Sequence, residues 1–184
     1  MTKNKSLHQL VFAGVLCAVG IVVPMFMPKV VLGPMSFTLA SHVSIFLAMF
    51  ISPAVAAAVC IGTTAGFFFT TTPVIALRAA SHIVFALAGA WYLHFRPETI
   101  RKPRSSLAYN AVVALVHAAS EVIVVTPFFL GGSLFSPEQL ANGFMMSVLL
   151  LVGVGTAIHS MIDYTLSVLI WRQVNHALAT KKPA

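Results

Sequence analysis

The run VIALRAASHIVFALAGAWYLHF, from Val74 to Phe95, is apolar almost throughout and contains Arg78. Such a run is long enough to cross about 30 Å of hydrocarbon at about 1.5 Å per helical residue. A guanidinium stays charged at any cellular pH, and at bilayer depth it costs from about 2.5 to more than about 10 kcal/mol. Residues of this kind usually face an interior cavity and have a partner or a ligand. We therefore predict that Arg78 lies on the inner face of a membrane-spanning helix.

The composition agrees with a membrane protein. Of the 184 residues, 59% are hydrophobic and 8% are charged, and the mean hydropathy is +0.95. Soluble domains carry about 25% charged residues. We predict an all-α integral membrane protein with a single transmembrane domain over residues 1–184. No GxxxxGK[ST] run is present, so the chain does not hydrolyse ATP through a P-loop.

Six helical segments account for the chain, and together they predict a six-helix transmembrane bundle. Their approximate bounds are 7–27, 39–51, 53–69, 74–95, 107–130 and 144–171. The second segment is too short to cross the bilayer, so we expect it to span part of the membrane or to lie beside a cavity. Residues 29–38 are predicted to form a loop, with Gly33 and Pro34 as its turn. Ser136 is predicted to cap a further short helix.

The net charge of +7 is distributed unevenly between the two sides of the predicted bundle. One side carries only Lys29, and the other carries Lys3, Lys5, Arg96, Arg101, Lys102, Arg104, Arg172, Lys181 and Lys182. Cytoplasmic loops of membrane proteins are enriched in Lys and Arg. We therefore predict a multi-pass protein of the cell membrane with both termini in the cytoplasm. The same pattern argues against nucleic acid as a partner.

Arg78 and His82 are four residues apart and share one helix face, which Phe85 continues. Arginine binds carboxylates through two parallel hydrogen bonds, so this face is predicted to hold a small anion. Two alternatives stay open: Arg78 extends to the outer surface, or it pairs with Glu121. Counting about 1.5 Å per residue from the predicted outer helix ends, Glu121 reaches the level of Arg78.

Two further pairs repeat the four-residue spacing, His117 with Glu121 and His159 with Asp163. Each pair can be a proton relay, a set of metal ligands, a support for a ligand-binding residue, or two polar groups that satisfy each other. Measured from Trp171 as the inner end, Asp163 is expected to lie deeper than Glu121, nearer the cytoplasm. These residues leave two alternative functions open, an intramembrane metalloenzyme and a stand-alone proton-coupled carrier.

Two stripes of small residues predict close helix contacts. The first contains Gly14 and Ala18, and the second contains Ala58, Gly62 and Gly66. We expect one stripe to pack inside the fold and the other to contact a partner.

Four stretches resemble the substrate-binding S components of energy-coupling factor (ECF) transporters, and among these the niacin-specific S component most. They are GPMSFTLASH (33–42), LRAASH (77–82), HAASEVIVVTP (117–127) and VGVGTAIHSMID (152–163). The resemblance implies six helices around a vitamin pocket near the outer face, no enzymatic activity and no cofactor in this chain. It also implies a membrane coupling subunit and two ABC ATPases as partners, which use the ATP. The AxxxA contact motif of the family falls on Gly14 and Ala18, with glycine in place of the first alanine.

The resemblance and the residue patterns together indicate one substrate-binding site, with no catalytic residue and no metal. Niacin suits it, because nicotinate offers a carboxylate to Arg78, a flat ring to an aromatic side chain and a ring nitrogen to a histidine. Another water-soluble vitamin or precursor is left open. The predicted substrate-binding residues are Arg78, His82, Glu121, His42, Phe37, His117 and Phe85.

Overall fold

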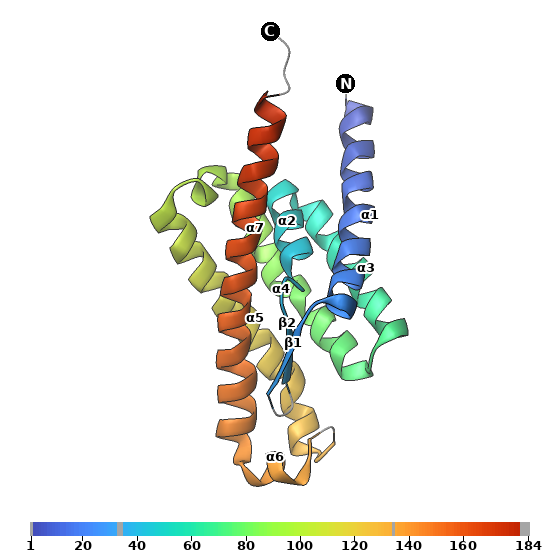
Figure 1. Ribbon diagram of the computed structural model, residues 1–184, viewed down its shortest axis with the longest axis vertical. Helices are drawn as coiled ribbons and strands as arrows, with labels where there is room; N and C mark the ends of the chain where they lie inside the picture. Colours follow the sequence, from blue (N-terminus) through green and yellow to red (C-terminus); the bar gives the residue numbers. More distant parts are fainter. Residues whose placement is uncertain (1, 33–34, 134, 181–184) are drawn as a thin grey trace.

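A computed structural model describes residues 2–32, 35–133 and 135–180. The chain forms an elongated helical bundle with a short hairpin inserted between its first two helices (Figure 1). The helices are α1 (Thr2–Phe26), α2 (Val43–Ile51), α3 (Pro53–Thr70), α4 (Pro73–Phe95), η1 (Pro97–Ile100, a 3-10 helix), α5 (Pro103–Leu130), α6 (Pro137–Ala141), η2 (Met145–Val154, a π-helix) and α7 (Gly155–Thr180); the strands are β1 (Lys29–Leu32) and β2 (Met35–Thr38).

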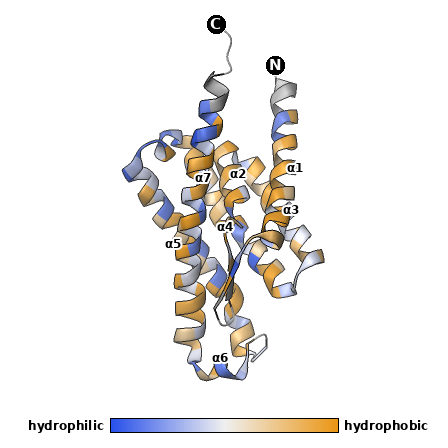
Figure 2. Ribbon diagram, in the orientation of Figure 1, coloured by the Kyte–Doolittle hydropathy of each residue, from blue (hydrophilic) through white to orange (hydrophobic). Residues whose placement is uncertain are grey.

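Five helical segments in the described part of the chain are long and apolar enough to cross a membrane. Hydrophobic residues dominate along most of these helices (Figure 2). The described residues contain seven α-helices rather than the six predicted, because Ser136 and Pro137 open the short helix α6 between two of the predicted spans. Ser136 caps α6 as predicted: its side chain accepts a hydrogen bond from the backbone of Gln139, and the side chain of Gln139 accepts one in return.

The stretch predicted to be a loop at 29–38 forms an antiparallel hairpin instead. Lys29 pairs with Thr38 and Val30 pairs with Phe37. Branched and aromatic residues favour the extended backbone here, although each strand is only four residues long. The predicted turn residues Gly33 and Pro34 lie outside the described residues. The hairpin returns the chain to the bundle immediately before α2.

Helix α2 forms the centre of the core. It spans nine residues, and it packs against α1, α3, α4 and α7. Phe46 and Ala48 are completely buried, and Ile45 and Met49 are almost so. Of the two expectations for this short segment, a position beside an interior cavity fits, because Ile45 also lines the cavity described below.

The start of α1, the end of α7 and the segment between α4 and α5 lie toward one end of the bundle, whereas α6 lies at the other (Figure 1). This arrangement places the basic segment 96–104 at the same end as the start of α1 and the end of α7. That this end faces the cytoplasm stays a prediction. Lys181 and Lys182, which belong to the same basic group, lie outside the described residues.

The two stripes of small residues have different surroundings. A Cβ atom added to Gly62 would lie 2.5 Å from Sγ of Cys17, and one added to Gly66 would meet the side chain of Ile21. The stripe on α3 therefore packs closely against α1. Gly14, in contrast, has nothing within 4 Å of such a Cβ, and Gly14 and Ala18 are both exposed.

Replacing Gly62 by Leu is expected to weaken the contact between α1 and α3. Overpacking of this kind costs about 1–3 kcal/mol, so the thermal unfolding midpoint of the detergent-solubilised protein should fall. Gly14→Leu is the matched control, because Gly14 faces open space on the same pair of helices, and its midpoint should stay unchanged. Equal midpoints for the two variants would show that α1 does not pack through Gly62.

Candidate functional site

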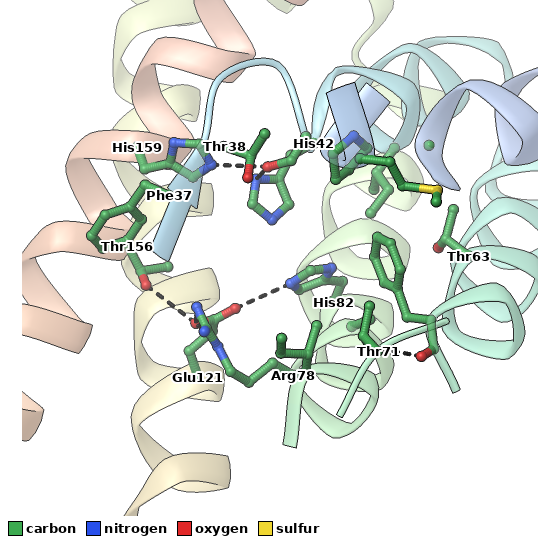
Figure 3. Close-up of a pocket in the computed structure, with 18 of the residues that line it drawn as sticks. Phe37, Thr38, His42, Thr63, Thr71, Arg78, His82, Glu121, Thr156 and His159 are labelled. Atoms are coloured by element: carbon green, nitrogen blue, oxygen red, sulfur yellow. Dashed lines mark hydrogen bonds and ion pairs between the residues drawn. The ribbon is translucent and has the colours of Figure 1, made fainter. Parts of the chain in front are cut away.

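A cavity of about 330 Å³ lies where the hairpin and the start of α2 meet α1, α3, α4, α5 and α7. Its wall is mixed, with aromatic and aliphatic side chains on several sides and a group of charged and imidazole side chains on one (Figure 3). The polar and aromatic residues that line it are Lys29, Phe37, Thr38, Ser41, His42, Thr63, Phe67, Thr70, Thr71, Arg78, His82, Glu121, Thr156 and His159.

Arg78 faces this cavity and is paired with Glu121. Nε of Arg78 donates to Oε2 of Glu121 at 2.7 Å, and Nη2 lies 2.6 Å from the same oxygen. The Glu121 side chain is 2% exposed, whereas that of Arg78 is 16% exposed. The pairing with Glu121, one of the two alternatives left open for Arg78, is therefore present. The guanidinium still lines the cavity while it makes this pair.

The carboxylate of Glu121 contacts side chains from three helices, α4, α5 and α7. Its Oε1 lies 3.2 Å from Nε2 of His82 on α4 and 3.6 Å from Nε2 of His117 one turn earlier on α5. Its Oε2 accepts a hydrogen bond from the hydroxyl of Thr156 on α7 at 3.3 Å. Figure 3 shows Arg78, His82 and Thr156 directed at this one carboxylate. A buried carboxylate needs such partners, since an uncompensated charge in the interior is costly.

Asp163 on α7 holds the turn that starts α2. It accepts hydrogen bonds from the backbone N–H groups of Ala40 and His42, both at 2.9 Å. Its Oδ2 also lies 3.1 Å from Nδ1 of His42. Ala40 has a φ of 65°, in the left-handed region that side chains other than glycine rarely adopt. The buried carboxylate thus stabilises an unfavourable turn and fixes the position of His42.

The depth expected for Asp163 is wrong. His42 contacts Asp163, and the centroid of its ring lies 4.7 Å from those of His82 and His117. Both predicted His–carboxylate pairs therefore lie at one level of the bundle. The error arises because Trp171 is not the end of its helix: α7 continues to Thr180.

Five of the seven predicted binding residues line the cavity, namely Phe37, His42, Arg78, His82 and Glu121. His117 and Phe85 do not line it. They are fully buried behind the wall, with ring centroids 4.4 Å apart. A direct contact of these two with a ligand stays a prediction.

Thr156, His159 and Lys29 are among the lining residues that were not predicted as binding residues. Thr156 precedes His159 by three residues and Asp163 by seven, so helical spacing places all three on one face. That pattern could have revealed Thr156 and His159 together. Lys29, which is exposed, adds a second cation to the wall and is the only basic residue on its side in the sequence pattern.

Two groups of side chains in the described part of the chain have ligand atoms close enough to share a metal ion: His42, His82 and His117, and His42, His159 and Asp163. Both groups contain His42, which sequence spacing could not connect to residues on three other helices. The four residues considered for a metalloenzyme, His117, Glu121, His159 and Asp163, do not form one such group.

Spanning helices around a small, polar and partly charged interior cavity define a multi-pass membrane protein that can hold a small solute. No family model matches the chain, and no solved structure matches it. The chain is 38% identical over 168 residues to the niacin transporter NiaX of Lactococcus lactis subsp. cremoris (strain MG1363). The match covers 90% of this chain and 74% of that protein. The chain belongs to the family of this transporter, which agrees with the resemblance to the S components of ECF transporters.

Family membership decides between the broad functional classes. The chain is a transport protein and not an enzyme, which removes the metalloenzyme alternative. The apolar helices and the transporter relative together confirm a multi-pass membrane protein involved in transport.

Asp163→Asn is expected to loosen the turn at residues 40–42. The amide NH₂ cannot accept a hydrogen bond where a carboxylate oxygen does, and hydrogen bonds to charged groups contribute about 1.5–3 kcal/mol each. Amide hydrogen exchange of residues 40–42 should accelerate roughly tenfold or more. Glu138→Gln, which neutralises an exposed acid, should leave exchange in this turn unchanged. Exchange rates in the Asp163 variant equal to those of the unchanged protein would mean that Asp163 does not stabilise the turn.

Proposed function

We propose that this chain is the substrate-binding subunit of an ECF-type importer and that its substrate is nicotinate. The observation that carries the proposal is the guanidinium of Arg78 on the wall of an interior cavity, in a chain that is 38% identical to a niacin transporter. In this proposal the bundle is the six-helix S-component fold, in which α2 is the buried short helix and α6 an addition between spans.

The cavity has the size and chemistry for a single aromatic ring with one carboxylate. Its volume of about 330 Å³ lies near the lower end of the range of roughly 300–1,000 Å³ for small-molecule sites. Arg78 and Lys29 supply positive charge for the carboxylate, and Phe37 supplies an aromatic face. His42 and His82 also line the cavity, and an imidazole N–H there can donate a hydrogen bond to the ring nitrogen. Mass spectrometry of small molecules released from the purified protein tests the identity of the ligand directly.

The proposed importer requires partner subunits. We infer a membrane coupling subunit and two ATPases that supply the energy from ATP, so this chain itself uses no cofactor. The distribution of Lys and Arg supports a cytoplasmic position for both termini. A stand-alone proton-coupled carrier would use Glu121 or Asp163, which are both buried. Nicotinate uptake in cells that lack the ATPases would favour that carrier over the proposed importer.

Arg78→Ala should reduce nicotinate binding below detection in calorimetric titrations of the purified protein, because the cationic fork that pairs with a carboxylate is lost. Thermal unfolding of the variant shows whether it is folded. Nicotinamide, in which a neutral amide replaces the carboxylate, should bind the unchanged protein at least roughly tenfold more weakly. Unchanged nicotinate affinity in a folded Arg78 variant would remove this residue from the site.

Replacing both Gly14 and Ala18 by Leu should prevent assembly with the coupling subunit, since bulky side chains block close helix approach. Both positions are exposed on α1 and Gly14 faces open space, so folding and nicotinate affinity should be unaffected. The test is copurification of the complex from cells that express all subunits. Normal recovery of the complex would assign the contact to another surface.

A further inference from the structure

Three buried imidazoles converge at the inner wall of the cavity. His42 at the start of α2, His82 on α4 and His117 on α5 are 8%, 6% and 0% exposed. Their ring centroids are 4.7 Å apart in all three pairs, and the rings stand nearly perpendicular to one another. One ligand nitrogen from each residue lies within 4.8 Å of the other two. From the sequence alone no metal is predicted here, because His42 joins the other two only in the fold.

Three of the ring nitrogens in this cluster have no hydrogen-bond partner in the described part of the protein. Among the described residues, Nδ1 of His82 and both ring nitrogens of His117 are buried without a hydrogen-bond partner. Each buried polar atom left unsatisfied costs about 1–3 kcal/mol. The second group, His42 with His159 and Asp163, differs, because none of its ring nitrogens is both buried and without a partner. The unsatisfied atoms therefore single out the group that contains His82 and His117.

Carboxylates support two of the three imidazoles. Nδ1 of His42 lies 3.1 Å from Oδ2 of Asp163, and Nε2 of His82 lies 3.2 Å from Oε1 of Glu121. A histidine that ligates a metal almost always donates its other N–H to a carboxylate, a carbonyl or water, which orients the ring and raises its basicity. In both residues the carboxylate contacts one ring nitrogen, and the other ring nitrogen is available to bind a metal ion.

The charges around the cluster favour a cation. Arg78 balances one carboxylate, but Glu121 and Asp163 are both buried in the same network. One negative charge is left over when the imidazoles are neutral. Lys29 also lines the cavity, but it is exposed, so solvent screens it from this network.

We propose that His42, His82 and His117 form a binding site for a zinc-type divalent metal ion. Imidazole nitrogens suit zinc, copper, iron and nickel. Three histidines with one open position are a known zinc arrangement, with Zn–N bonds of about 2.0–2.1 Å. His42 and His82 also line the cavity, so the open position faces the space that holds the solute.

The metal site is tested on the full chain in detergent, purified through a tag without histidines and in the absence of nicotinate. After dialysis against Zn²⁺ and then against metal-free buffer, elemental analysis should find about one zinc per chain. His117→Gln and His82→Gln should each lower this content at least roughly tenfold. His94→Gln is the matched control, because His94 is an exposed histidine on the same helix as His82, and it should retain the metal.

Loading with Co²⁺ gives a second readout that needs no variant. Cobalt bound by three imidazoles in tetrahedral geometry shows intense visible absorption bands, which excess Zn²⁺ should remove. Absence of these bands together with no retained zinc would overturn the proposal and leave a proton on the histidines as the balancing charge. Equal zinc content in the His94 and His117 variants would overturn it as well. Because both readouts omit nicotinate, they are independent of whether niacin is the substrate.

Discussion

The ion pair between Arg78 and Glu121 is the interaction on which the interior of this protein depends. Burying either charge alone inside a membrane bundle would cost several kcal/mol of free energy. Together they join α4 to α5 through contacts of 2.6–2.7 Å, and this fixes which faces of the two helices turn inward. The Arg78 side chain stays 16% exposed toward the cavity. Its planar group carries further N–H donors, so the same pair that closes the bundle still presents positive charge to a solute.

From this pair the polar network extends across the whole cavity. Glu121 connects α4, α5 and α7 through Arg78, His82 and Thr156. Asp163 connects α7 to the turn before α2. His42 lies between the two carboxylates: its Nδ1 contacts Asp163, and its ring contacts that of His82, which contacts Glu121. Most of the side chains that link the helices therefore also line the cavity. An acid that enters the cavity has to bind in an interior that already contains two carboxylates.

The sequence predicts most of the helices and the principal charged residues, for a simple physical reason. Arg78 and Glu121 interrupt long apolar runs, and a charged side chain in such a run almost always faces the interior of the bundle. The level of Glu121 was estimated correctly because α5 does end at Leu130. The level of Asp163 was not, because α7 passes beyond Trp171 without a break. The cluster around His42 could not be predicted, since it joins a turn, two further helices and α7 by tertiary packing alone.

Helix α1 both lines the cavity and exposes small residues. Gly20, Pro24 and Met25 belong to the cavity wall, whereas Gly14 and Ala18 are exposed. Gly14 and Gly20 are separated by roughly 9 Å along the helix at about 1.5 Å per residue. Close contacts at Gly62 and Gly66 seat this helix on α3. Because packed interiors transmit strain, a movement of α1 at its exposed face would alter the cavity wall less than two helical turns away.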